Sequence, residues 1–389
     1  MQPQTDVIFD GAHFSRIKRT IRNMAVGKRE SDKNNLQMFK TPDEVGIQLT
    51  NKCNLRCKTC FQWNEEGFFN NYSNDDKNDE IPLDIIKRIL EETKENKSNL
   101  YLWGGEPLSY GQLDELSYVL EMDPRWTVFC TNGVNIGNKI ESIVRISKSL
   151  ALLISLDGFQ EENDVVRGNG VFNKVLSNIE TLIQLQKEGK YKGEVSVNCV
   201  ISEPMIGKLF DFASMMEIKG INTLYLCFPW YLPQKTSEKM DLFFKEHFSW
   251  LHNIDKETPS WHSYKYQLDP KKYLNLITDL TNINNKKWAI RIRYQPALES
   301  DEIVDFLTGK EKTAQNRKKC IGLFNRMNVL PNGKVTVCKM YPEFEVGDLN
   351  TESVKDIWNG NKFKKVREIL NGRLMPVCSK CILLYLHGV

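Results

Sequence analysis

The chain lacks any stretch that could span or enter a membrane. Its longest apolar run, residues 150–156, is interrupted by Ser155 and is far shorter than the roughly 20 residues of a membrane-spanning helix. The first residues, Met-Gln-Pro-Gln-Thr-Asp, lack the basic-then-apolar pattern of a secretory signal. We therefore expect a cytoplasmic protein, with no membrane partner and with reduced thiols.

A strong excess of charge of one sign is also missing. The 53 Lys and Arg residues nearly balance the 50 Asp and Glu residues, for a net charge of +3, so no strong steering field for nucleic acid is implied. Residues 1–45 are locally basic, and we interpret them as a solvated amphipathic helix followed by a linker. No nucleic-acid partner is expected, although the basic stretch leaves nucleic-acid modification open as an alternative.

What is present is an ordinary globular composition with an unusual set of cysteines. Of 389 residues, 41% are hydrophobic and 26% charged, and the length exceeds one typical domain. Ten cysteines in a reducing compartment indicate metal binding more than disulfides. Cys130, Cys199 and Cys227 lie in apolar, strand-like runs and are interpreted as small buried hydrophobes. The other seven form two groups: Cys53, Cys57 and Cys60, and Cys320, Cys338, Cys378 and Cys381.

Strands and helices alternate along the first two thirds of the chain. Six strands are predicted at 45–50, 100–103, 126–130, 150–156, 195–201 and 223–228, with helices at 83–95, 112–121, 140–147, 171–187 and 206–218. This alternation predicts an α/β fold with a parallel sheet. Right-handed crossovers would curl the sheet into a partial (β/α)6 TIM-like barrel.

The remaining chain divides into further segments. The expected parts are a basic N-terminal extension (1–45), the partial barrel (46–235), a connecting region (236–315) and a small C-terminal α+β domain (316–389). The connecting region contains a predicted helix at 240–251 and a strand at 289–294. The polar loop 61–80 is long enough to be a lid or a disordered stretch.

Four unusual segments follow the predicted strands directly. They are Cys53-x3-Cys57-x2-Cys60, Gly104-Gly105-Glu106-Pro107, Thr131-Asn132-Gly133 and Ser155-Leu156-Asp157-Gly158. In such barrels the chemistry lies at the C-terminal ends of the strands, so these segments are expected around one mouth. No fourth Cys or His stands near the first group. Three thiolates can hold three corners of a four-iron cluster and leave one iron open to a ligand that is not protein.

The cysteine run after the first strand and Gly-Gly-Glu-Pro after the second resemble the radical S-adenosylmethionine (radical SAM) superfamily over residues 46–230. The resemblance implies that Cys53, Cys57 and Cys60 carry a catalytic 4Fe-4S cluster, and that SAM binds the open iron. It also implies reductive cleavage of SAM to a 5′-deoxyadenosyl radical, which abstracts hydrogen from a substrate carbon. A reductant such as flavodoxin or ferredoxin is an implied partner.

The same resemblance implies contacts to SAM. Gly104 and Gly105 would let the backbone approach the ligand, and Glu106 would accept from its amino group. The other implied contacts are Ser155 and Asp157 to the ribose or methionine end, Arg167 to the carboxylate, Asn198 to the ribose, and the backbone near Leu226 to the adenine. One residue departs from the family pattern, because Thr59 stands where an aromatic is usual, and Phe61 is expected to cover the cluster instead.

The second cysteine group surrounds a hairpin signal. Cys320-x17-Cys338 brackets two short strands within 329–337 that are joined by Pro-Asn-Gly. A helix is predicted at 354–370, and Cys378-x2-Cys381 follows. Four cysteines make one complete metal site, and spacing alone leaves a structural zinc ribbon and an iron–sulfur cluster equally open.

This tail resembles the SPASM/twitch extension of radical SAM enzymes. The resemblance implies one auxiliary 4Fe-4S cluster held by all four cysteines, hence electron transfer and two clusters in the whole protein. His387 stands where a further cysteine would be expected, and its role as a ligand is left open.

An auxiliary cluster suits oxidation, formation of a new bond, or epimerisation, for which Cys227 is the candidate hydrogen donor. The family implies a peptide substrate, with the chain acting as a maturase. Residues 1–45 are too short for a fused recognition domain, so a separate recognition protein is expected. One alternative is a dehydrogenase or epimerase of an aminosugar or aminocyclitol. An alternative of another class is a non-catalytic iron–sulfur or zinc-binding scaffold.

Overall fold

A ten-stranded sheet organises the molecule. The computed structural model describes residues 2–33, 36, 38, 40–252, 254–256 and 258–388. The strand order is β12-β11-β10-β2-β3-β4-β5-β6-β7-β9. The strands are β2 (Glu44–Gln48), β3 (Asn99–Trp103), β4 (Thr127–Thr131), β5 (Leu150–Ser155), β6 (Glu194–Val200), β7 (Thr223–Cys227), β9 (Arg291–Gln295), β10 (Arg326–Val329), β11 (Lys334–Thr336) and β12 (Glu345–Asp348); the short pair β1 (Gln4–Thr5) and β8 (Lys287–Trp288) lies apart.

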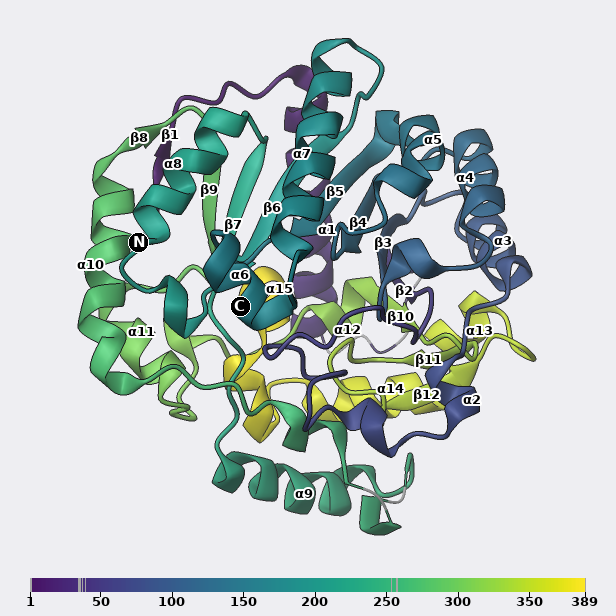
Figure 1. Cartoon of the computed structure of the whole chain (residues 1–389). Helices are drawn as coiled ribbons and strands as arrows, with labels where there is room; N and C mark the ends of the chain where they lie inside the picture. The colour runs from purple at the N-terminus through teal and green to yellow at the C-terminus, as the bar shows by residue number, and fades with distance from the viewer. Residues whose placement is uncertain are drawn as a thin grey trace.

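The curved parallel part of the sheet is wrapped by helices (Figure 1). The helices are α1 (Gly11–Asp32), α2 (Asn74–Lys77), α3 (Leu83–Glu92), α4 (Leu113–Met122), α5 (Ile140–Arg145), α6 (Gln160–Arg167), α7 (Val171–Lys187), α8 (Leu209–Lys219), α9 (Gln234–Phe248), α10 (Tyr273–Asn285), α11 (Ser300–Leu307), α12 (Gly322–Asn325), α13 (Val354–Trp358), α14 (Asn361–Leu370) and α15 (Ile382–His387). The predicted α/β partial barrel is confirmed, because β2 to β7 pair in parallel in chain order. No helix of the described residues combines the length and apolar character needed to cross a bilayer.

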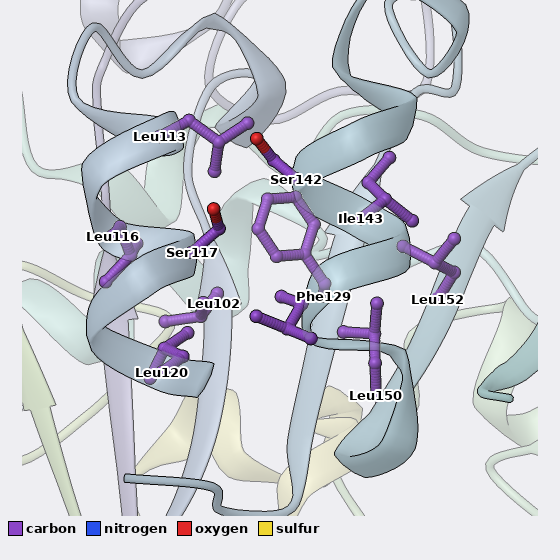
Figure 2. Close-up of a pocket in the computed structure, with 11 residues that line it drawn as sticks. Leu102, Leu113, Leu116, Ser117, Leu120, Phe129, Ser142, Ile143, Leu150 and Leu152 are labelled. Atoms are coloured by element: carbon purple, nitrogen blue, oxygen red, sulfur yellow. The ribbon is translucent and has the colours of Figure 1, made fainter. Parts of the chain in front are cut away.

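Alternation along the strands separates an outer face from an inner face. Leu102, Phe129 and Leu152 point outward against α4 and α5, as Figure 2 shows. The small cavity that they line measures about 10 Å³, the space of about one water. We read it as a packing gap in an apolar core. Residues one position away, such as Tyr101 and Cys130, therefore face the inside of the barrel.

Two strands extend the barrel beyond the six predicted ones. β9 pairs with β7 in parallel, so the strand predicted for the connecting region belongs to the main sheet. At the opposite edge β10 pairs in parallel with β2 and in an antiparallel sense with β11. The predicted hairpin is therefore confirmed, and it carries the C-terminal region onto the barrel edge next to the strand that precedes Cys53.

The structure differs from the sequence-based expectation at three places. The helix predicted at 354–370 is two helices, α13 and α14, because the chain leaves the helical conformation at Gly360, whose backbone is extended. Helix α6, which ends at Arg167, was not predicted. The loop 61–80 is not without structure, since it holds a 3-10 helix (Phe68–Asn71) and α2.

The helix predicted within residues 1–45 is present as α1, and only Gly27 and Ser31 of it are buried, but it is also bonded to the barrel. It lies at the N-terminal ends of the barrel strands, behind them in the view of Figure 1. Arg16 bonds Glu194 at the start of β6, and Arg19 donates to the carbonyl of Asn96 just before β3. The opposite, C-terminal mouth of the barrel is where the four unusual segments end.

Candidate functional site

The first cysteine group lies on the loop that leaves β2, beneath a cluster of aromatic side chains. Trp63, Phe68 and Phe69 are buried together and pack against Cys53 and Cys60. The Trp63 amide donates to Cys60 Sγ at 3.4 Å. The loop after the cysteines is therefore ordered by apolar burial against them, and its aromatic residues cover one side of the thiols, which stay partly exposed.

Phe61, expected to cover the site, packs against the same aromatic cluster and also reaches the connecting region. Its ring stacks on Tyr264 with centroids 4.5 Å apart, and it lies 5.6 Å from the ring of Trp230. The Tyr264 hydroxyl in turn donates to the carbonyl of Met340, close to the second cysteine group. A continuous row of aromatic and main-chain contacts therefore joins the two cysteine groups.

Gly104 and Gly105 are required by the protein's own backbone. A Cβ on Gly104 would lie 2.5 Å from the carbonyl oxygen of Thr50, and one on Gly105 would lie 2.2 Å from that of Lys52. The Gly105 amide donates to Thr50 and the Glu106 amide to Lys52. These contacts fix the Gly-Gly-Glu-Pro turn directly against the segment that delivers Cys53.

Glu106 is fully buried and already engaged. Its carboxylate accepts from the Thr131 hydroxyl (2.6 Å) and from the amides of Asn132 (2.7 Å) and Leu108 (2.9 Å). Burial raises the pKa of Glu106, and these donors oppose that rise. Asn132 also donates to Asn54 within the cysteine loop. Two segments that the sequence had separated, Thr-Asn-Gly and Gly-Gly-Glu-Pro, are thus tied together beside the cysteines.

Arg167 and Asp157 form a buried pair beside the thiols. Arg167 Nε lies 2.8 Å from Asp157 Oδ2, and Arg167 Nη1 lies 3.8 Å from Cys57 Sγ. Asp157 is wholly buried and also accepts from the amide of Val200. Burial alone would lower the pKa of Arg167, but Asp157 and Cys57 more than offset it, so the pKa is raised and the guanidinium stays charged.

The next strands carry the remaining predicted contacts. Ser155 on β5 stands opposite Asn198 on β6, and both lie on the inner face. The Cys227 thiol donates to the Asn198 side-chain oxygen at 2.8 Å. The side chain of Leu226 is buried on the outer face, so only its backbone borders the interior.

The sequence suggested that Cys130, Cys199 and Cys227 are all alike, as small buried hydrophobes. The structure shows that they are not. Cys199 is buried on the outer face, whereas Cys130 and Cys227 stand on the inner one. The Cys130 thiol donates to the Tyr101 hydroxyl at 2.7 Å. Alternation within each strand was the signal that could have separated them, once the outer face was known.

Burial keeps the first cysteine group protonated when no metal is bound. It raises the pKa of Cys53 to about 12 and that of Cys57 to about 11, and it also raises the pKa of Cys60. Neighbouring thiols raise the values of Cys53 and Cys57 further, while Arg167 opposes the shift at Cys57. Because metal ligands must be thiolates, binding of iron here would release protons.

The second cysteine group converges on one cavity. Cys320, Cys338, Cys378 and Cys381 all line a space of about 50 Å³, several times what a single water needs. Cys338 stands two residues after the β10–β11 hairpin, α12 follows Cys320, and Cys381 precedes α15. Among the described residues, no three or more His, Cys, Asp or Glu are grouped closely enough to hold a single metal ion. The side chain of His387 lies outside the described part of the chain.

Cations surround this cavity, and the sequence did not single them out. Arg326, Lys339 and Arg373 line it together with the cysteines. Arg326 is 4% exposed, pairs with Glu44 at 2.8 Å, and leaves Nη2 buried without a hydrogen-bond partner. Lys339 stands over the Tyr101 ring at 3.8 Å. Burial lowers the pKa of Lys339 to about 8, so its ammonium is charged only below that pH. Four thiolates beside positive charge fit an iron–sulfur cluster, which carries net negative charge with four cysteine ligands.

Two known domain families match the two cysteine groups. The profile of the Radical SAM superfamily matches residues 47–201, and SPASM, an iron–sulfur cluster-binding domain, matches residues 320–382. Together the two matches cover more than half of the chain.

The curated relatives are distant in sequence, but they align with most of the chain. A cysteine-type anaerobic sulfatase-maturating enzyme of Clostridium perfringens is 24% identical over 345 residues, which covers 85% of this chain and 83% of the relative. An AdoMet-dependent heme synthase of Methanosarcina barkeri is 25% identical over 364 residues, covering 89% of this chain and 93% of the relative.

A solved structure shares the fold. SuiB of Streptococcus suis, bound to its precursor peptide SuiA, superposes with a TM-score of 0.58 at 15% identity, covering 88% of this chain and 70% of SuiB.

Proposed function

Because the chain belongs to the radical SAM superfamily and ends in an iron–sulfur cluster-binding SPASM domain, we propose that this enzyme is a maturase that modifies a peptide at a carbon–hydrogen bond. The single observation that carries the proposal is that one sheet holds two thiol groups of different size, three on the β2 loop and four around a common cavity. When bound, the cofactors supply a 5′-deoxyadenosyl radical at the first group and an electron acceptor or donor at the second.

We assign the protein ligands accordingly. Cys53, Cys57 and Cys60 hold the SAM-binding cluster. The auxiliary cluster is held by Cys320, Cys338, Cys378 and Cys381. The aromatic residues over the first group keep water from one side of it, which helps to protect a reactive radical from quenching. Strands β9 and β10 continue the barrel sheet, so the connecting region and the C-terminal domain are both paired to the barrel.

Arg167 binds the carboxylate of SAM in this proposal, and Asp157 positions it. A guanidinium offers a planar fork to a carboxylate, and the contact of Nε with Asp157 fixes the orientation of that fork. Asp157 is too deeply buried to reach the ribose directly, so its role is positioning. Ser155 and Asn198 remain the proposed ribose contacts, and the backbone near Leu226 borders the adenine.

Glu106 mainly holds the turn at the barrel mouth. Its carboxylate has roughly four acceptor sites, and three donors already occupy it. One site therefore remains for the amino group of SAM. Gly104 and Gly105 bring this turn against the cysteine loop, so Glu106 would hold the amino group of SAM beside the segment that carries the cluster ligands.

The peptide substrate is supported by the relatives. The sulfatase-maturating enzyme aligns over most of its length, and the fold is shared with a structure that contains a precursor peptide. A small aminosugar or aminocyclitol is the alternative substrate class. The expected partners are a one-electron reductant and a separate peptide-recognition protein, in the cytoplasm.

Epimerisation is a second candidate reaction, favoured by one observation. Cys130 and Cys227 both stand on the inner face, where a thiol could return a hydrogen atom to a substrate radical. The thiol would lose its hydrogen to the substrate carbon, and the reductant would then restore it with one electron and one proton.

Anaerobic turnover tests these proposals. The reconstituted enzyme, SAM and dithionite should release 5′-deoxyadenosine, and a scaffold protein would release none. Addition of a precursor peptide encoded beside the gene should yield a modified peptide. A loss of about 2 Da indicates dehydrogenation or cross-linking, whereas a gain of about 1 Da in heavy water indicates epimerisation. If only a cyclitol is modified, the peptide assignment is wrong.

A further inference from the structure

Helix α1 exposes its apolar side and turns Arg16 and Arg19 toward the barrel. Phe14 is 65% exposed, Ile21 62% and Ile17 37%. These positions repeat at three- and four-residue intervals and form one stripe along the helix. A surface helix normally turns such a stripe toward the core.

The opposite side of α1 is held to the barrel by polar contacts. Arg16 Nη2 bonds Glu194 at 2.9 Å, and its guanidinium lies 4.1 Å over the ring of Trp126. Arg19 donates to the carbonyls of Asn96 and Lys97. Polar contacts therefore hold the helix to the barrel, and its apolar stripe takes no part in this. The described part of the chain leaves the stripe uncovered.

Positive charge borders the exposed stripe. No Asp or Glu occurs from Gly11 to Arg29, a stretch that contains Lys18 and Arg22. Both side chains are exposed, and neither forms an ion pair within the described residues. An apolar centre with a cationic rim complements an acidic protein surface.

The same helix touches the loop that carries Cys320. A Cβ on Gly27 would lie 2.7 Å from Ile321, and Lys319 pairs with Asp32 at 3.0 Å. These contacts flank Cys320 on both sides. Ile21 is six residues before Gly27, about 9 Å along the helix axis. The end of the stripe at Ile21 therefore lies within two helical turns of the residue that contacts the Cys320 loop.

We propose that the exposed face of α1 docks a small, acidic one-electron carrier protein that exchanges electrons with the auxiliary cluster. The inference rests on the proposed function, since it takes Cys320 as a cluster ligand. One electron leaves the reduced cofactor of the carrier as the cluster gains it, or passes in the reverse direction, and no bond is made or broken. Fixed cations around the cavity stabilise the added electron.

The test uses the full chain and an acidic flavodoxin as the probe. Two double variants alter the surface: Phe14→Glu with Ile21→Glu, and Lys18→Glu with Arg22→Glu. The matched control is Leu242→Glu with Leu274→Glu, at sites 70% and 77% exposed on α9 and α10. Binding of oxidised flavodoxin should weaken by about tenfold or more in both test variants and stay unchanged in the control. Wild-type binding should also weaken as salt rises.

Turnover provides a second readout. With reduced flavodoxin the α1 variants should form 5′-deoxyadenosine and product at about one tenth of the wild-type rate or less. With dithionite, which needs no docking, they should match the wild type. If the wild type releases none with dithionite, the proposed function fails, and the binding titration then judges the docking site alone.

Three results would overturn the inference. One is unchanged flavodoxin binding in both α1 variants. Another is a wild-type dimer that the variants convert to a monomer, which would make a second copy of the chain the occupant of the stripe. The third is binding to anionic lipid vesicles that is lost in the variants, which would make the occupant a membrane surface.

Discussion

The two cysteine groups are assembled in different ways. Cys53, Cys57 and Cys60 lie on one loop, within eight residues of each other, and the turns around them hold them in place. The second group spans residues 320–381 and meets at one cavity only because the β10–β11 hairpin joins the barrel edge. The first site is local and has three thiols, whereas the second is built by long-range pairing and is complete with four.

Loss of the first cysteine group should have the largest effect. Replacing Cys53, Cys57 and Cys60 by Ala should lower SAM cleavage by about a hundredfold or more, because no thiolates then hold the open cluster. Release of 5′-deoxyadenosine measures this. The matched control is Cys199→Ala, which removes a buried thiol outside both groups. Persistent cleavage in the triple variant would refute the site assignment.

Loss of the second group should separate cleavage from product formation. In Cys378→Ala with Cys381→Ala, SAM cleavage with dithionite should persist in part while product formation stops, because the auxiliary electron path is broken. Iron content should fall by about four per chain. A product yield equal to that of the wild type would mean that the second site is structural, and zinc instead of iron in the purified protein would point the same way.

Arg167 tests the geometry of the first site. Arg167→Lys should raise the KM for SAM by about 10- to 100-fold, because an ammonium cannot contact Asp157, Cys57 and a carboxylate with one planar fork. Asp157→Asn should have a smaller effect in the same direction, since it disturbs only the orientation of Arg167. Equal KM values in all three proteins would exclude Arg167 from the SAM site.

Lys339 tests the electrostatics of the second site. Lys339→Met should lower the midpoint potential of the auxiliary cluster by about 60 mV, because a nearby cation favours the more negative, reduced state. An EPR-monitored redox titration would measure the shift, and the potential of the first cluster serves as the internal control. A higher KM for substrate with an unchanged potential would show that Lys339 binds substrate instead.

The metal-free protein should lose stability as the pH rises above about 9. Burial raises the pKa of Cys53 to about 12 and that of Cys320 to about 11, so above pH 9 the folded state binds more protons than the unfolded state. The free energy of unfolding is then largest below pH 9 and decreases as the pH rises toward the pKa values of the folded state. The decrease is about 1.4 kcal/mol per thiol at pH 10. Urea unfolding at pH 8 and pH 10 would measure it. Cys53→Ala and Cys320→Ala should each reduce the slope.

Much of this could be predicted from sequence because it depends on local pattern. The alternation of apolar strands and helices predicted six strands, β2 to β7, within one or two residues, and Pro-Asn-Gly predicted the hairpin. The break at Gly360 and the short helix α6 were missed. At Gly360 the cause is local, because a Cβ there would lie 2.9 Å from the carbonyl oxygen of Asp356.

The chain by itself determined the barrel and the three-cysteine loop, because hydrophobic period and cysteine spacing act over a few residues. Only the tertiary structure decided that Cys130 and Cys227 face inward, that Asp157 orients Arg167, and that α1 turns its apolar side outward. Strand register sets the facing of the two cysteines, and contacts such as that of Arg16 with Glu194 set the facing of α1. Asp157 and Arg167 are only ten residues apart, but the end of β5 and the end of α6 must both be placed before they meet. No local pattern encodes which face of an element will meet which partner.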